Sequence, residues 1–366
     1  MHDVLIFYMP VIVADEAPEV WRNTVRATET SQSCSVSPEY QGFLDSLANQ
    51  LEARETSSSA LLINLGPSWD GMFDLRICMW QAQDCTWEDP AGIGICPLDT
   101  LTGICARMHE HISRAKNPLV ILHPHTCSNT GQSLSNFIMA AHYIFSTGME
   151  SVSDAIELIE ANMVRARKSS QTTQRGMNVR LLAGQKRYCE YLSWLLYHPH
   201  LVPTEMKTRL RLKSISFTKL SAFHHHMTFG NSEEEEEEEG SINKSSWRPE
   251  RLLMGIFCSG KQVWSGGCAP GSIDEDKDFI KFELSTTHNF GDGDTCGVHL
   301  DGDVIIAVWF NDHKSKWTPP RIAYAFHTAF LGQDDEEYQQ VRLFARHLDT
   351  PDTSRSKLWH CFGDVQ

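Results

Sequence analysis

The stretch from Asn117 to Phe145 constrains the fold more than any other part of the chain. An apolar segment, Pro118 to Leu122, is typical of a buried strand, and a loop of small residues, Thr126 to Ser133, leads from it into an apolar helix, Asn136 to Phe145. A loop that enters a helix N-terminus directs several backbone N–H groups at one point, which favours an anion there. The pattern therefore predicts a strand–loop–helix that cradles phosphate.

The side chains of this loop decide whether it can catalyse a reaction. A cysteine-dependent phosphatase needs a thiolate nucleophile and, six positions later, an arginine that grips the phosphate. Cys127 is present, but Ser133 stands at the arginine position, and no lysine or arginine occurs between Asn117 and Val164. The sequence predicts a degenerate loop with no catalytic residue. Asp89 is a candidate remnant of a general acid, although Asp-Pro is also ordinary turn chemistry.

The first part of the chain alternates between strand and helix patterns, which predicts a central sheet flanked by helices in an α/β domain over residues 1–200. Besides the stretch above, the expected strands are Val4–Tyr8 and Ala60–Asn64, and the expected helices are Tyr40–Arg54, Leu98–Ser113, Val152–Val164 and Gln185–Tyr197.

A boundary is expected between Leu196 and Arg209, because the pattern then changes to a period of two residues. Residues 206–350 are predicted to form an all-β sandwich with a low-complexity acidic loop at 224–246, followed by a polar tail at 351–366. The expected strands are Arg209–Phe217, Leu252–Cys258, Gln262–Trp264, Phe279–Leu284, Asp303–Phe310 and Ile322–Leu331.

Charge is strongly segregated along the chain. The net charge is −15, yet twelve basic and two acidic residues between Arg165 and Lys219 give that segment a net charge of +10. Such a belt favours an anionic partner, here anionic membrane lipids such as phosphoinositides, and no nucleic acid is expected. Alternatively, the basic residues pair with acids elsewhere. The candidate lipid-binding residues are Lys207, Arg209, Arg211, Lys213, Lys186 and Arg187.

Cysteine usage and the N-terminus indicate a cytoplasmic protein. The eleven cysteines include no Cys-x-x-Cys pair, which favours reduced thiols and argues against a structural zinc site. The N-terminus lacks the basic region of a signal peptide. The histidines around Pro124 are interpreted as structural and the aspartates of Gly291–Asp303 as turn residues. No metal and no cofactor are therefore expected.

Five stretches carry a resemblance to a known family: Cys96–Ile112, Cys127–Ala140, Ala183–Leu196, Gly302–Asp312 and Phe326–Leu331. In their order and spacing they resemble the module shared by the phosphatase-and-tensin homologue, tensins and auxilins, most closely that of plant class II formins. The third stretch matches the family's helix motif at Arg187, Tyr188 and Tyr191, but Ala183-Gly184 replaces its Pro-Ser. The His-Cys pair of active members aligns with either Thr126-Cys127 or His123-Pro124.

The resemblance implies a phosphatase tensin-type domain, here a pseudophosphatase, followed by a C2 tensin-type domain. Such a module would bind phosphoinositides and proteins and associate peripherally with membranes. Its expected partners are cytoskeletal or coat proteins, in formin-like actin or auxilin-like clathrin function. Two alternatives stay open. One is an active lipid or protein phosphatase that uses Cys127 with an arginine from elsewhere, such as Arg165 or Arg187; the other is a protein-binding adaptor whose belt is buried.

Overall fold

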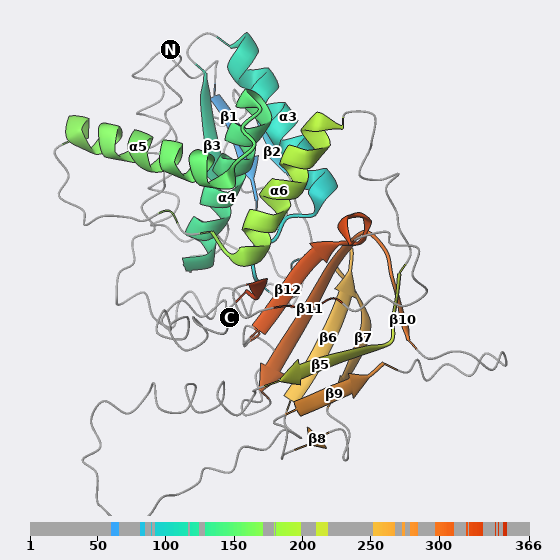
Figure 1. The fold of residues 1–366 in the computed structure, drawn as a ribbon. Helices are drawn as coiled ribbons and strands as arrows, with labels where there is room; N and C mark the ends of the chain where they lie inside the picture. The colour runs from blue at the N-terminus through green and yellow to red at the C-terminus, as the bar shows by residue number, and fades with distance from the viewer. Residues whose placement is uncertain are drawn as a thin grey trace, which may run out of the picture. The chain divides into compact units, whose positions relative to one another are not determined.

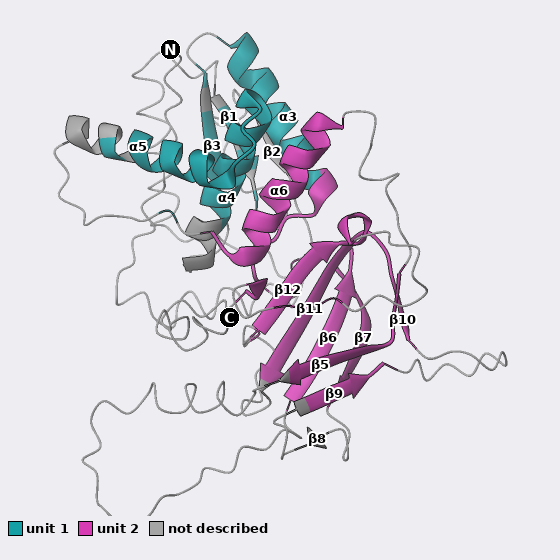
Figure 2. Cartoon of the chain, in the orientation of Figure 1, with its two compact units in different colours: residues 1–87, 100–179 teal, residues 88–99, 180–366 magenta. Residues whose placement is uncertain are grey.

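The structure is a computed structural model (Figure 1), which describes residues 60–65, 81–84, 89, 92–115, 118–123, 129–170, 179, 181–198, 210–218, 252–267, 273–274, 279–284, 297–310, 320, 322–331, 341, 343 and 347–349. The predicted elements Val4–Tyr8 and Tyr40–Arg54, the acidic loop and the tail lie outside the described residues. Contacts divide the chain into two compact units (Figure 2). Unit 1 comprises residues 1–87 and 100–179, and unit 2 comprises residues 88–99 and 180–366.

Unit 1 contains a parallel sheet in the order β2-β1-β3, formed by β1 (Ala60–Asn64), β2 (Gln81–Asp84) and β3 (Leu119–His123). Parallel sheets occur with both faces covered, and Leu61 and Ile63 of the central strand are fully buried. The bounds predicted for β1 are confirmed, and those for β3 were one residue early. The sequence QAQD of β2 was missed, because it is short and polar.

Three helices accompany this sheet: α3 (Leu98–Arg114), α4 (Asn129–Thr147) and α5 (Val152–Ser170). Every residue from Leu134 to His142 is buried, including the polar residues Ser135, Asn136 and His142. α4 packs against α5, where the Asn162 side-chain amide donates a hydrogen bond to the Tyr143 hydroxyl at 3.0 Å. None of the helices in the described part of the chain is long and apolar enough to span a membrane.

Unit 2 combines antiparallel strands with helix α6 (Ala183–Tyr197). The largest sheet has the order β12-β11-β6-β7, with β6 at Leu252–Cys258, β7 at Lys261–Gly267, β11 at Asp303–Phe310 and β12 at Ile322–His327. A second sheet has the order β5-β9-β8 (Ser214–Thr218, Phe279–Glu283, Ile273–Asp274), and β10 (Val298–Leu300) pairs with β4 (Leu210–Leu212).

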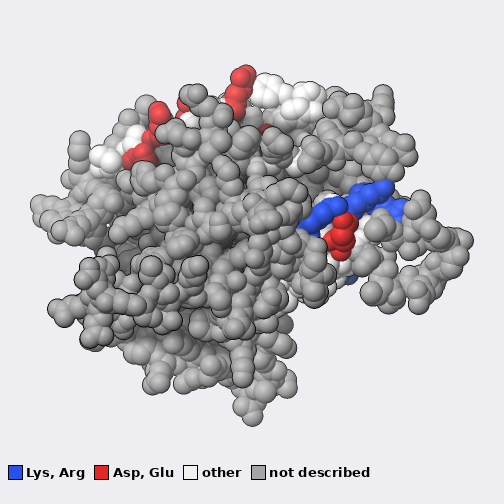
Figure 3. Space-filling model, turned by 60° about the horizontal axis from the view of Figure 1, so that its bottom comes forward, with Lys and Arg blue, Asp and Glu red and all other residues white. Residues whose placement is uncertain are grey.

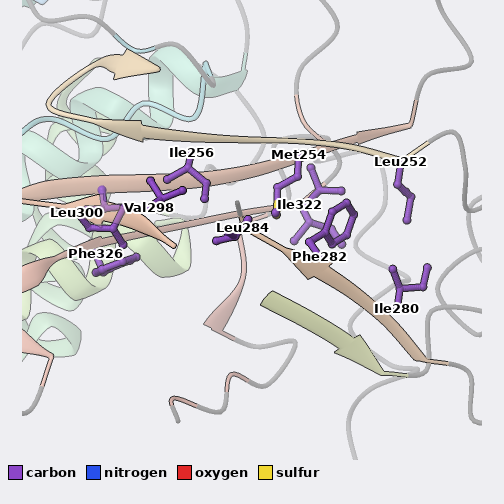
Figure 4. Packing of buried hydrophobic residues seen from close by; sticks show 12 residues of the cluster. Leu252, Met254, Ile256, Ile280, Phe282, Leu284, Val298, Leu300, Ile322 and Phe326 are labelled. Carbon is purple, nitrogen blue, oxygen red and sulfur yellow. The ribbon is translucent and has the colours of Figure 1, made fainter. Parts of the chain in front are cut away.

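One apolar cluster joins these sheets (Figure 4). It draws Leu252, Met254 and Ile256 from β6 at a spacing of two, together with residues of β11 and β12, and Phe282 and Leu300 from the smaller sheets. Burying each such side chain contributes about 1.5–3 kcal/mol. Strands of separate sheets thus share one core, as packed sheets do. The chain is therefore a protein of mixed helix and sheet.

The structure departs from the predicted second domain in two respects. The single strand expected at Arg209–Phe217 is two strands, β4 and β5, which belong to different sheets and separate at Lys213. The Lys213 carbonyl accepts a hydrogen bond from the Leu284 amide at 3.0 Å, which holds the chain where it changes sheet. In addition, contacts group α6 with the strands, so unit 2 is not purely β.

Candidate functional site

The predicted anion loop belongs to unit 1. β3 ends at His123 and α4 begins at Asn129, so the predicted order of strand and helix is confirmed. The connection, residues 124–128, lies outside the described residues, and Cys127 lies within it. The predicted helix start at Asn136 was wrong, because α4 begins seven residues earlier. Small polar residues favour loops by propensity but are also good first-turn residues, which explains the error.

The loop that leads into α4 contains no lysine or arginine that could bind a phosphate at the helix N-terminus. Ser133 lies in the second turn of α4, and its side chain is outside the described atoms. The absence of lysine and arginine from Asn117 to Val164 is a property of the sequence. Arg165 belongs to α5, and its side chain is likewise not described. Of the two arginines named as possible substitutes, Arg187 in unit 2 is the one whose side chain is described.

Asp89 acts as a turn residue of unit 2. Its carboxylate accepts hydrogen bonds from the Ile93 amide at 3.2 Å and the Gly94 amide at 2.7 Å, and its carbonyl accepts one from the Gly92 amide at 3.0 Å. An aspartate that accepts nearby backbone amides stabilises a turn. These contacts favour the turn interpretation of Asp89 over that of a general acid.

Arg187 is tied to the backbone of unit 2. Its guanidinium donates hydrogen bonds to the Ala325 carbonyl and, at 2.7 Å, to the His347 carbonyl. The same group lies 4.3 Å from the centre of the Tyr324 ring, in cation–π geometry. Arg187 therefore joins α6, β12 and the segment around His347, which is a structural role.

These contacts cover the edge of the largest sheet. β12 is its terminal strand, and an edge strand leaves backbone groups unpaired unless something covers it. Ala323 and Asp349 exchange backbone hydrogen bonds of 2.8 and 2.7 Å, and the Tyr188 hydroxyl donates to the Phe326 carbonyl at 3.2 Å. With the bond from Arg187 to the Ala325 carbonyl, groups outside the sheet bond the backbone of β12 at Ala323, Ala325 and Phe326.

Aromatic side chains extend the same contact. Tyr191 of α6 stacks on Phe330 with ring centres 4.0 Å apart, and Trp194 meets Phe330 edge-on at 5.3 Å. Two stretches that carry the family resemblance, Ala183–Leu196 and Phe326–Leu331, thus contact each other within unit 2. We call this contact the α6–β12 joint; it comprises Arg187, Tyr188, Tyr191, Trp194, Tyr324, Ala325, Phe326, Phe330 and Asp349.

Two buried carboxylates of unit 2 accept backbone amides at helix starts. Asp303 accepts from the amide of Leu98, the first residue of α3, at 3.2 Å. Asp349 accepts from the Gly184 amide, near the start of α6, at 2.7 Å. Negative charge is favoured at helix N-termini. Burial nevertheless raises the pKa of both carboxyl groups to about 6, because it disfavours the charged form.

Gly184 makes room for the Asp349 carboxylate. A Cβ atom added at Gly184 would lie 2.6 Å from Asp349 Oδ2, which is shorter than any normal contact. Among the described buried side chains, Asp349 Oδ2 is one of the few oxygens without a hydrogen-bond partner. The Ala183-Gly184 pair, where the family has Pro-Ser, is therefore compatible with a carboxylate that no sequence motif had indicated.

The candidate lipid-binding residues separate into three groups. Arg187 is engaged in the α6–β12 joint, whereas Lys186, Arg211 and Lys213 have exposed side chains. Lys207 and Arg209 lie outside the described residues. In Figure 3, described lysine and arginine side chains form a short row with an acidic side chain beside it. The exposed members of the described set are therefore Lys186, Arg211 and Lys213, and Arg187 is not among them.

In the described part of the chain, the aspartates of Gly291–Asp303 form no metal site. Asp303 accepts a hydrogen bond from the Leu98 amide, while Asp292 and Asp294 lie outside the described residues. Within the described ranges, no group of three or more histidine, cysteine, aspartate or glutamate residues is placed to hold a metal ion.

Comparison with known proteins leaves the family open. No protein-family model matches the chain, and no curated protein matches it. Among solved structures, the chain is similar to a crystal structure of a mutant form of Tk-PTP. The two share 13% identity over 41% of this chain and 86% of that chain, with a TM-score of 0.27. The interpretation of the site therefore rests on the residues of this chain.

Sequence reasoning missed two functional candidates of unit 2. Asp349 follows β12 in a polar stretch without a motif, so no local signal marks its burial. His299 lies in Gly291–Asp303, a stretch that was interpreted as turns, but Val298 to Leu300 forms β10 and exposes His299. The alternation of Val298, His299 and Leu300 is the available signal, and it is weak because it spans three residues.

Proposed function

We propose that this chain is a pseudophosphatase module that binds phosphoinositide-bearing membranes. Unit 1 supplies a phosphatase-like strand–loop–helix without turnover, and unit 2 supplies the basic surface that contacts anionic headgroups. The module acts by targeting, and its location is cytoplasmic with peripheral membrane association.

The commitment of Arg187 carries this proposal. A thiolate at Cys127 would need an arginine to lower the thiol pKa and to hold the phosphate dianion. Position 133 is serine, and the sequence has no lysine or arginine from Asn117 to Val164. Arg187 was one of two arginines considered as a substitute, and its guanidinium is bound to the Ala325 and His347 carbonyls. Backbone amides alone are a weak replacement.

The assignment of each unit to a domain type follows the sequence motifs. We place unit 1 with the phosphatase tensin-type domains and the strands of unit 2 with the C2 tensin-type domains, as in formin-like or auxilin-like proteins. The contact between the third and fifth matching stretches supports this assignment, because both carry the resemblance. Actin-linked or clathrin-linked partners follow from the same resemblance. The active phosphatase that uses Cys127 is the competing function.

We expect no phosphatase turnover from the purified chain on an aryl phosphate or on phosphoinositides. The reason is the serine at position 133 combined with the engagement of Arg187. Phosphate release is the measurement, and Cys127→Ser is the control for contaminating activity. Turnover that disappears in Cys127→Ser would establish the active-phosphatase alternative instead.

We expect the chain to bind phosphoinositide vesicles, and we expect salt to weaken this binding. Changing both Arg211 and Lys213 to glutamine should lower the affinity about thirtyfold, because each basic residue near an anionic surface contributes about 1 kcal/mol. The matched control neutralises two exposed arginines of unit 1, Arg107 and Arg114.

Vesicle flotation at low salt measures the binding. Equal losses in the two double variants would mean that net charge, and not this surface, governs it. Deleting the acidic run Glu233–Glu239 should strengthen binding by removing a competing anion. If the wild type floats with no anionic vesicle, the targeting function gives way to the protein-adaptor alternative.

A further inference from the structure

We draw no further inference here: the strongest candidate, the exposed aromatic surface of Trp194 and Tyr197 in the last turn of α6, carries nothing, because nothing in the described part of the structure shows which partner would cover it.

Discussion

Replacing Arg187 with glutamine should lower the free energy of unfolding of unit 2 by about 3–5 kcal/mol. The substitution removes two hydrogen bonds from a charged donor, to the Ala325 and His347 carbonyls, and each such bond contributes about 1.5–3 kcal/mol. It also removes the cation–π contact with Tyr324. Chemical denaturation gives the total loss, and hydrogen exchange should place it at the β12 amides.

The adjacent residue provides a matched control. Lys186 is exposed on the same helix, so Lys186→Gln should change the free energy of unfolding by no more than about 0.5 kcal/mol. Arg187→Lys should recover only part of the loss, because an ammonium cannot reach two carbonyls in a planar fork. Equal effects of Arg187→Gln and Lys186→Gln would show that the α6–β12 joint does not depend on the guanidinium.

The contacts of Arg187 are structural and differ from the lipid-binding role that the sequence predicts for it. The sequence placed Arg187 among the lipid-binding residues, and its side chain instead contacts the backbone of β12 and His347. A charge count treats every arginine alike, whereas backbone carbonyls brought together by distant segments decide which one is sequestered. The sequence shows that residue 187 is basic, and only the fold shows which carbonyl groups its guanidinium bonds.

Local patterns predicted most described elements of the fold. The bounds of β1, β6 and β11 were predicted as observed, because each is an apolar segment bordered by polar or turn residues. The short strands β8 and β10 were missed, since two or three residues carry little periodic signal. The grouping of α6 with the strands depends on contacts of Arg187 and Tyr188 with β12, which no local pattern encodes.

The two units should respond to acid in opposite directions, and His142 of α4 sets the response of unit 1. His142 Nε2 is buried without a partner, and burial, assisted by nearby His109, lowers the His142 pKa from 6.5 to about 4. As the pH falls, the His142 side chain of the unfolded chain is therefore protonated at a higher pH than that of the folded chain. The contribution of neutral His142 to the free energy of unfolding of unit 1 is fully present above about pH 6.5. It falls by up to about 3 kcal/mol as the pH drops to about 4. His142→Leu should remove this dependence.

Asp349 gives unit 2 the opposite sign. Burial raises the pKa of the Asp349 carboxyl from 3.8 to about 6, so the folded form holds a proton that the unfolded chain has lost. This contribution is complete below about pH 3.8 and disappears as the pH rises through about 6, a change of up to about 3 kcal/mol. Asp303, whose pKa is raised to about 6 as well, acts in the same direction.

Hydrogen exchange between about pH 4 and pH 6.5, corrected for intrinsic rates, resolves the two units within one chain. Acidification should lower the opening free energy of α4 amides and raise that of α6 and β12 amides. Asp349→Asn should reduce the response of α6 and β12 without affecting that of α4, while Glu190→Gln, at an exposed site on α6, should leave it unchanged. If acid destabilises α6 and β12 in parallel with α4, and Asp349→Asn weakens this acid response, Asp349 is ionised in the folded chain. Its contact with the Gly184 amide would then resemble an ordinary charged helix cap, stabilising at neutral pH and lost in acid.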